Sequence, residues 1–163
     1  MALEKMKALA GFLLQQNLFA AENLDYWMEN GSNEYTGKKV GNGYLISRFR
    51  YDAVFSIERY SKSADLLLVL LSVWLMENDC GRSDLELPMP EVDVTPLDDY
   101  TVDLEIKVAF DECISIVPDD DGIILYRGAR YNVAPAVITD ATKVGVGDNQ
   151  IRPTDKPYDR DQD

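Results

Sequence analysis

The stretch from Ser63 to Asn78 reads S-A-D-L-L-L-V-L-L-S-V-W-L-M-E-N and is the most apolar run in the chain. It begins with side chains that accept hydrogen bonds in a first helical turn, Ser63 or Asp65. It ends at Asn78-Asp79-Cys80-Gly81, a sequence typical of a helix stop. Five apolar residues fall at helical spacing, with three further leucines on the flank: Leu66, Val69, Leu70, Val73 and Trp74, then Leu67, Leu71 and Leu75. Because a helix that is apolar on nearly every side is buried on nearly every side, we expect this segment to be the central core helix.

Length and composition indicate a single domain with a substantial core. The chain has 163 residues, 46% of them hydrophobic, and a formal net charge of −13. This charge argues against groove-type DNA binding, and the absence of histidine removes histidine-based catalysis and metal ligation. Cys80 and Cys113 are too few for a zinc site or a disulfide framework, so we expect reduced thiols. The apolar run of residues 63–78 is too short to span a bilayer, which needs about 20 apolar residues, so we expect no contact with a membrane.

The N-terminal third is predicted to be helical and then irregular. Residues 3–17 carry an apolar helical stripe, and residues 20–29 resemble a second short helix that stops at Asn30-Gly31. The glycine-rich segment from Gly31 to Gly43 is expected to be a surface loop, or a hairpin with a glycine-rich tip. It lacks the spacing and the hydroxyl residue of a phosphate-binding loop.

Alternating apolar residues predict strands on both sides of the central helix. The predicted strands cover residues 44–46, 50–60 and 101–110, and residues 85–94 form an extended edge segment despite their prolines. Residues 113–117 and 123–127 flank the turn at Asp121-Gly122 and predict a hairpin. The fold class is therefore α+β, with a mainly antiparallel sheet and helices packed on one face. We place a single domain at residues 1–138 and an acidic, flexible or partner-ordered tail at residues 139–163.

The acidic clusters are the main candidates for chemistry. Asp98-Asp99 and Asp119-Asp120-Asp121 together offer oxygens for a divalent cation, but they lack the alternating spacing of a calcium loop, and solvated turns explain them better. No serine has a base in a recognisable motif, and Cys113 lies on a predicted strand among apolar residues. We therefore expect no catalytic residue, no cofactor and no metal.

The order of these segments resembles that of a known family. The segments that carry the resemblance are, in chain order, E-N-G-S at residues 29–32, the strand at 51–60, the helix D-L-L-L-V-L-L-S-V-W-L-M-E-N, a variable acidic segment, the strand at 102–110, and the turn at Asp121-Gly122. This pattern is similar to the tail completion, or tail terminator, protein R of P2-like phages with contractile tails and of related phage-tail-like bacteriocins. The resemblance covers residues 3–133. Its most specific part lies in the helix, where Trp74, Leu75, Glu77 and Asn78 stand as in the family.

The resemblance implies a structural virion protein that is assembled in the host cytoplasm. Such a protein forms a ring, expected to be a hexamer, that caps the head-proximal end of the tail tube and sheath and stops their polymerisation. Its partners are copies of itself, the tube and sheath proteins, and the neck or head-tail connector. DNA passes through the lumen without specific binding. We hypothesise that one of the two acidic clusters faces this lumen, either Asp119, Asp120 and Asp121 or the pair Asp98 and Asp99.

A second class of function stays open from the sequence. A small acidic cytosolic adaptor, or an assembly chaperone that binds one protein partner, has the same composition. A ring-forming protein should close on itself, whereas an adaptor should be monomeric or dimeric and bind one partner stoichiometrically.

Overall fold

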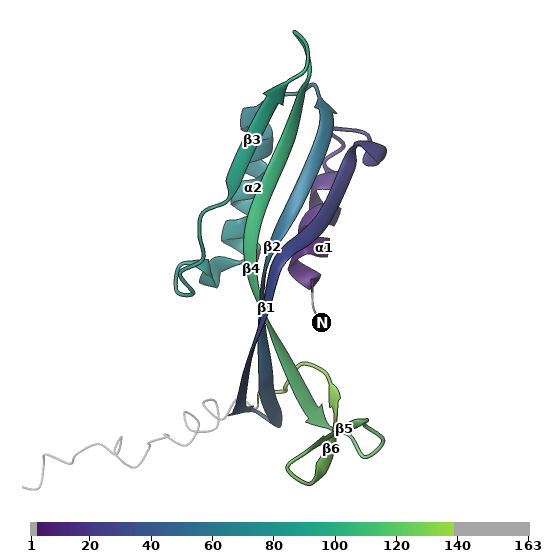
Figure 1. The fold of residues 1–163 in the computed structure, drawn as a ribbon, viewed down its shortest axis with the longest axis vertical. Coiled ribbons are helices and arrows are strands. Elements are labelled where there is room, and N and C mark those ends of the chain that lie inside the picture. Colours follow the sequence, from purple (N-terminus) through teal and green to yellow (C-terminus); the bar gives the residue numbers. More distant parts are fainter. Residues whose placement is uncertain (1–2, 139–163) are drawn as a thin grey trace, which may run out of the picture.

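A computed structural model describes residues 3–138 and gives two helices on one face of a six-stranded antiparallel sheet (Figure 1). Helix α1 spans Glu4–Gln15 and helix α2 spans Ala64–Asn78. The strands are β1 (Leu24–Val40), β2 (Gly43–Tyr60), β3 (Glu91–Pro96), β4 (Val102–Pro118), β5 (Ile124–Tyr126) and β6 (Ala129–Val133). The strand order is β1-β2-β4-β6-β5, and β3 pairs with β4 as well. The predicted α+β class is confirmed. The proposed tail at 139–163 lies outside the described residues.

The three long strands divide the molecule into two parts. We call residues 3–31 and 51–110 the body, where the helices cover the sheet, and residues 32–50 and 111–138 the arm, which projects beyond them (Figure 1). Helix-facing side chains of the body form the core, and alternate residues of β2 and β4 supply its centre. These are Tyr51, Ala53, Phe55 and Ile57 from β2, and Leu104, Ile106, Val108 and Phe110 from β4.

Residues 20–29 were predicted to form a helix, and this prediction was wrong. A 3-10 turn at Ala21–Asn23 leads into β1, in which Leu24 pairs with Ile57 and Tyr26 with Phe55. The rings of Tyr26 and Phe55 stack with centroids 6.1 Å apart. Every second residue of this segment faces the helices, so pairing with β2 overrides the short helical pattern.

The expected stop at Asn30-Gly31 is also wrong, because the chain continues as a strand through it. The register of β1 on β2 shifts between Glu29 and Ser32, and Asn30 has a φ of 52° there. Such a β-bulge absorbs an extra residue and bends the strand. For the Gly31–Gly43 segment, the sequence left a surface loop and a hairpin open. The structure shows the hairpin, because Val40 pairs with Gly43 across Gly41-Asn42.

The hairpin predicted at Asp121-Gly122 is not a direct pairing of its two flanking strands. The N–H of Gly122 closes the turn on the carbonyl of Asp119 at 2.9 Å, but β6 lies between β4 and β5. The tight hairpin occurs one strand later, at Arg127-Gly128, where both residues have positive φ. Of the predicted edge segment at 85–94, only residues 91–94 lie in the edge strand β3, and residues 85–90 precede it outside any strand.

Candidate assembly surfaces

Helix α2 starts and ends where the sequence predicts, but its buried face is not the predicted one. The buried residues are those placed on the flank, together with Trp74: Leu67, Leu71, Trp74 and Leu75. Burial was predicted for five residues of this helix and is wrong for three of them, because Leu66, Val69 and Val73 are exposed. Leu70 is half-buried. Ser63 makes no side-chain cap hydrogen bond.

The exposed apolar residues of α2 form one continuous line, which we call the helix stripe. Its members are three or four positions apart and therefore share a face of the helix. They are Leu66, Val69, Val73 and Met76, with exposed fractions of 44%, 58%, 39% and 67%. A single exposed apolar side chain needs no explanation, but a contiguous line of four indicates a contact surface.

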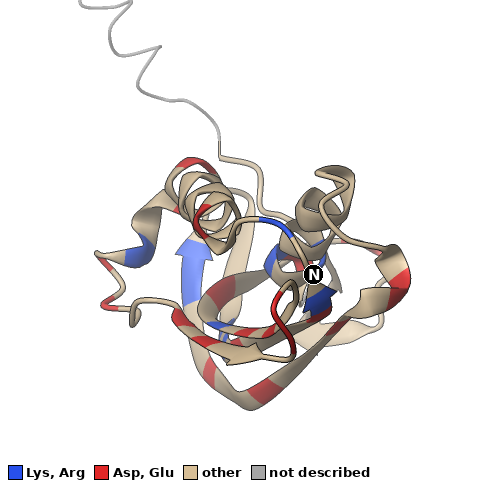
Figure 2. Ribbon diagram, turned by 90° about the horizontal axis from the view of Figure 1, so that it is seen from above, with Lys and Arg blue, Asp and Glu red and all other residues tan. Residues whose placement is uncertain are grey.

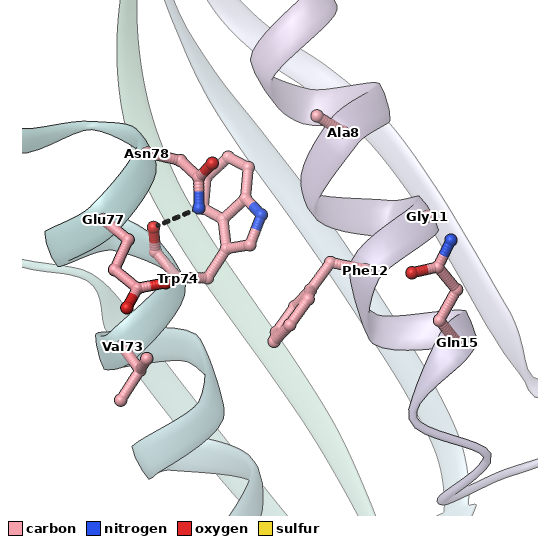
Figure 3. Close-up of a pocket in the computed structure, with 8 residues that line it drawn as sticks. All are labelled: Ala8, Gly11, Phe12, Gln15, Val73, Trp74, Glu77 and Asn78. Carbon is pink, nitrogen blue, oxygen red and sulfur yellow. Dashed lines mark hydrogen bonds between the residues drawn. The ribbon is translucent and has the colours of Figure 1, made fainter.

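The helix stripe runs into an open groove between α1 and α2. The groove has a volume of about 500 Å³ and shares Val73 with the stripe. Phe12 points into it from α1 and Trp74 from α2 (Figure 3). A Cβ added at Gly11 would meet nothing within 4 Å, so the α1 side of the groove is open. The groove lining is mixed, because Gln15, Glu77 and Asn78 line it beside the apolar residues, so the apolar surface of the helix layer is the stripe itself.

The opposite face of the body is acidic. Cross-strand rows place seven carboxylates on the side of the sheet that the helices leave free; we call this set the acidic sheet face (Figure 2). It consists of Asp25, Glu29, Asp52, Glu91, Asp93, Asp103 and Glu105. Lys107 lies on the same face, with its ammonium 3.7 Å from Glu29. The body has 17 acidic and six basic residues, so most of the chain's negative charge is concentrated there.

The predicted acidic residues lie at opposite ends of β4. Asp98 and Asp99 are in the β3–β4 turn of the body, while Asp119, Asp120 and Asp121 follow β4 in the arm. A 17-residue strand separates them by roughly 50 Å, so they do not form one cation site. Among residues 3–138, no three or more His, Cys, Asp or Glu side chains are placed so that together they could hold a metal ion.

Each acidic cluster has a local structural role. Asp98 accepts from the N–H groups of Tyr100 and Thr101 at 2.8 and 2.7 Å. The hydrogen bond from Tyr100, followed by those from Thr101, holds the pKa of Asp98 below its usual value. Asp119 accepts from the N–H of Asp121 at 3.0 Å. These contacts are those of ordered turns.

A buried charge network joins the body to the arm, and sequence reasoning missed it. Asp111 is buried and accepts from Arg48 and Arg50 at 2.9 and 2.6 Å. Asp79, immediately after α2, is also buried and pairs with Lys5 and Arg82 at 2.6 and 2.8 Å. The ammonium of Lys5 also donates to the carbonyl of Asp111 at 3.0 Å.

Glu112 completes this junction by capping α1 from a distant strand. Its carboxylate accepts from the N–H groups of Glu4 and Lys5 at 2.9 and 3.3 Å, and it accepts a short hydrogen bond from the Tyr51 hydroxyl. Burial, followed by the Glu112 carboxylate, raises the pKa of Tyr51. The only sequence signal was a pair of adjacent acids directly after an alternating strand.

The fold and these surfaces define a small α+β protein with an exposed apolar stripe on its helix layer and a carboxylate-rich sheet face. The family described as P2 phage tail completion protein R (GpR) matches residues 3–135, and the chain belongs to that family. A protein of Haemophilus phage HP1 (strain HP1c1) is 28% identical over 128 residues, which are 76% of this chain and 77% of that protein. It is described as "Uncharacterized 19.2 kDa protein in rep-hol intergenic region". No solved structure matches the chain.

Family membership supports a structural role in phage tail assembly, with tail components as partners and the virion tail as location. The resemblance seen in the sequence is thereby confirmed. Neither of the helices described at residues 3–138 is long and apolar enough to cross a membrane.

Proposed function

We propose that this protein forms a closed ring, a hexamer, that caps the head-proximal end of the tail tube and sheath. The ring stops polymerisation of both and offers its other side to the neck of the capsid. The observation that carries the proposal is the combination of family membership with large, dissimilar contact surfaces on one small chain. A subunit that repeats one contact around a closed axis needs two different complementary surfaces.

The acidic sheet face suits the wall of a channel through which DNA slides. Carboxylates repel phosphate groups, so DNA passes without adhering. The Asp98-Asp99 turn extends this face at the end of the body, and Asp119 to Asp121 add charge at the far end of β4. We propose that all of these residues face the lumen.

Two measurements test the ring and its position. Light scattering of the purified protein at several concentrations should give the mass of a closed hexamer, alone or after addition of tail tubes. Electron microscopy with isolated tubes should then show caps at one end only. A monomer that leaves tube ends bare, or a 1:1 complex with a single partner, would contradict the proposal and favour an adaptor.

The lumen assignment is tested separately by charge reversal. Replacing Asp99 with lysine, which keeps the turn hydrogen bonds that Asp98 accepts, should leave the ring intact and slow DNA passage, measured as delayed genome release from assembled particles. The same change at Asp120 and Asp121 should act in the same direction. Loss of the ring in either variant would instead place those residues in an interface between subunits.

A further inference from the structure

The helix stripe has no partner within the part of the chain that the structure describes. An apolar side chain of this size stabilises a contact when it is removed from water. Four such side chains in one line, next to an open groove, form a site that an apolar element of another chain can cover.

The arm carries a second exposed apolar surface, on the β5–β6 hairpin. Ile123, just before β5, and Leu125, within it, have exposed fractions of 88% and 71%. Ile123 lies at the bend that leads into β5 and Leu125 in the middle of β5, so the two exposed apolar side chains are close together at the start of the hairpin. Among residues 3–138, β5 is the last strand of the sheet and no strand pairs with its outer edge.

This hairpin is held in place by contacts behind it. The ring of Tyr44 lies 5.2 Å from that of Tyr126 and 5.9 Å from that of Tyr131, and both contacts are edge to face. The guanidinium of Arg127 lies over the rings of Tyr44 and Tyr126, and that of Arg130 donates to the carbonyl of Gly122 at 3.0 Å. A preorganised element loses little conformational freedom when it binds.

The hairpin cannot reach the helix stripe of its own chain. It starts beyond Pro118, seven residues past Asp111, which corresponds to roughly 20 Å of extended strand leading away from the helices (Figure 1). Since β4 stays paired with β2 along this length, the hairpin points away from α2. The two apolar surfaces can therefore meet only between different copies.

Charge complements the apolar match. Helix α2 carries Asp65 and Glu77 beside the stripe and has no basic residue. Asp119, Asp120 and Asp121 precede the hairpin, but its strands and turn, residues 122–133, carry Arg127 and Arg130 and no acidic residue. Opposite charges at the margin of an apolar contact fix its orientation and disfavour stripe-to-stripe pairing, which would bring like charges together.

We propose that the β5–β6 hairpin of one copy docks on the helix stripe of the next copy. Ile123 and Leu125 cover the stripe, and Arg127 and Arg130 lie beside Asp65 and Glu77. The contact joins two different surfaces, so it repeats from copy to copy and closes into a ring when the rotation permits. The inference rests on the self-assembly of the proposed function and names the surfaces that carry it.

The test uses two full-length variants that each lose one surface. The stripe variant is Val69→Glu with Met76→Glu, and the hairpin variant is Ile123→Glu with Leu125→Glu. All four side chains are exposed in the single chain, so both variants should fold. Each variant alone should stay monomeric where the unmodified protein assembles, with at least about tenfold weaker association, because an unpaired charge would be buried in the contact.

Mixing the two variants gives the decisive result. One intact stripe and one intact hairpin remain in the mixture, so the mixture should form 1:1 pairs and nothing larger. Met89→Glu, at an exposed apolar residue outside both surfaces, is the matched control and should assemble normally. If the hairpin variant assembles normally, or the mixture stays monomeric, the proposal is overturned.

Cross-linking gives an independent readout and separates the two levels of inference. With Cys80 and Cys113 replaced by serine, Val69→Cys with Leu125→Cys should give covalent oligomers on mild oxidation, whereas Met89→Cys with Leu125→Cys should not. A ring that forms without this cross-link and survives both double variants refutes the docking but keeps the proposed function. Absence of any ring from the unmodified protein, even on tail tubes, refutes the proposed function itself.

Discussion

Replacing Glu112 with alanine should destabilise the protein far more than a typical change at a charged residue. The carboxylate accepts three hydrogen bonds, from the N–H groups of Glu4 and Lys5 and from the Tyr51 hydroxyl. Helix α1 has no side-chain cap of its own at Leu3. The change would leave three donors without this partner at the start of α1, where the positive end of the helix dipole also favours a carboxylate.

The magnitude follows from these contacts. A buried donor without a partner costs about 1–3 kcal/mol, and water can replace part of this loss at the two backbone groups, which are only partly buried. We expect a loss of about 3 kcal/mol in the free energy of unfolding. With a urea m value of about 2 kcal/mol/M, the unfolding midpoint should fall by about 1.5 M.

Urea unfolding followed by the fluorescence of Trp27 and Trp74 measures this shift, at one protomer concentration for all variants. The matched control is Glu105→Ala, an exposed carboxylate on the same strand, which should change the free energy of unfolding by no more than about 0.5 kcal/mol. A Glu112→Ala midpoint that falls no further than that of the control would refute the view that Glu112 caps α1.

Three further predictions concern other parts of the fold. Burial and the Glu112 carboxylate raise the pKa of Tyr51, so the folded protein keeps this proton above about pH 10 while the unfolded chain loses it. Stability should therefore fall as pH rises above about 10, by up to about 1.4 kcal/mol per pH unit for this group, and Tyr51→Phe should show a shallower decline in urea unfolding measured between about pH 9 and 11. On α2, Leu67→Ala should lower the free energy of unfolding of the monomer by about 3 kcal/mol, because the side chain is fully buried. Leu66→Ala should lower it by less than about 1 kcal/mol. Equal losses would contradict the assignment of Leu67 to the buried face of α2. In the arm, a Cβ at Gly43 would collide with the carbonyl of Ile116. Gly43→Ala should therefore lower the free energy of unfolding by about 1–3 kcal/mol and speed amide hydrogen exchange in residues 32–50. Unchanged exchange there would show that the strands adjust without loss of stability.

The sequence predicted those elements whose local pattern agrees with their final environment. Alternation over residues 101–110 and 50–60 correctly indicated strands with one buried face, because each second residue does contact the helices. The helix at 63–78 was also correctly bounded. Residues 44–46 and 113–117 were also correctly predicted to be extended, but alternation did not show that residues 43–60 form one unbroken strand.

Other features depend on contacts between residues far apart in the chain. Residues 20–29 have a pattern compatible with a short helix, and only the pairing of Leu24 with Ile57 and of Tyr26 with Phe55 makes them a strand. Glu112 looks like a surface acid in the sequence, yet it is buried 108 residues away from its partner Glu4. No local signal could reveal that it caps a helix.

The sequence alone determined the α+β class, the position of the central helix, the acidic character of the chain and, through its motif, the family. Only the tertiary structure decided which face of that helix is buried. A helix that is apolar all round has no preferred face, so packing on the curved sheet selects Leu67, Leu71, Trp74 and Leu75. The same packing leaves the helix stripe in solvent, because a sheet covers only one side of a helix. A pattern that suggested complete burial within one chain therefore leaves four apolar side chains exposed, and the proposed contact between copies is built on them.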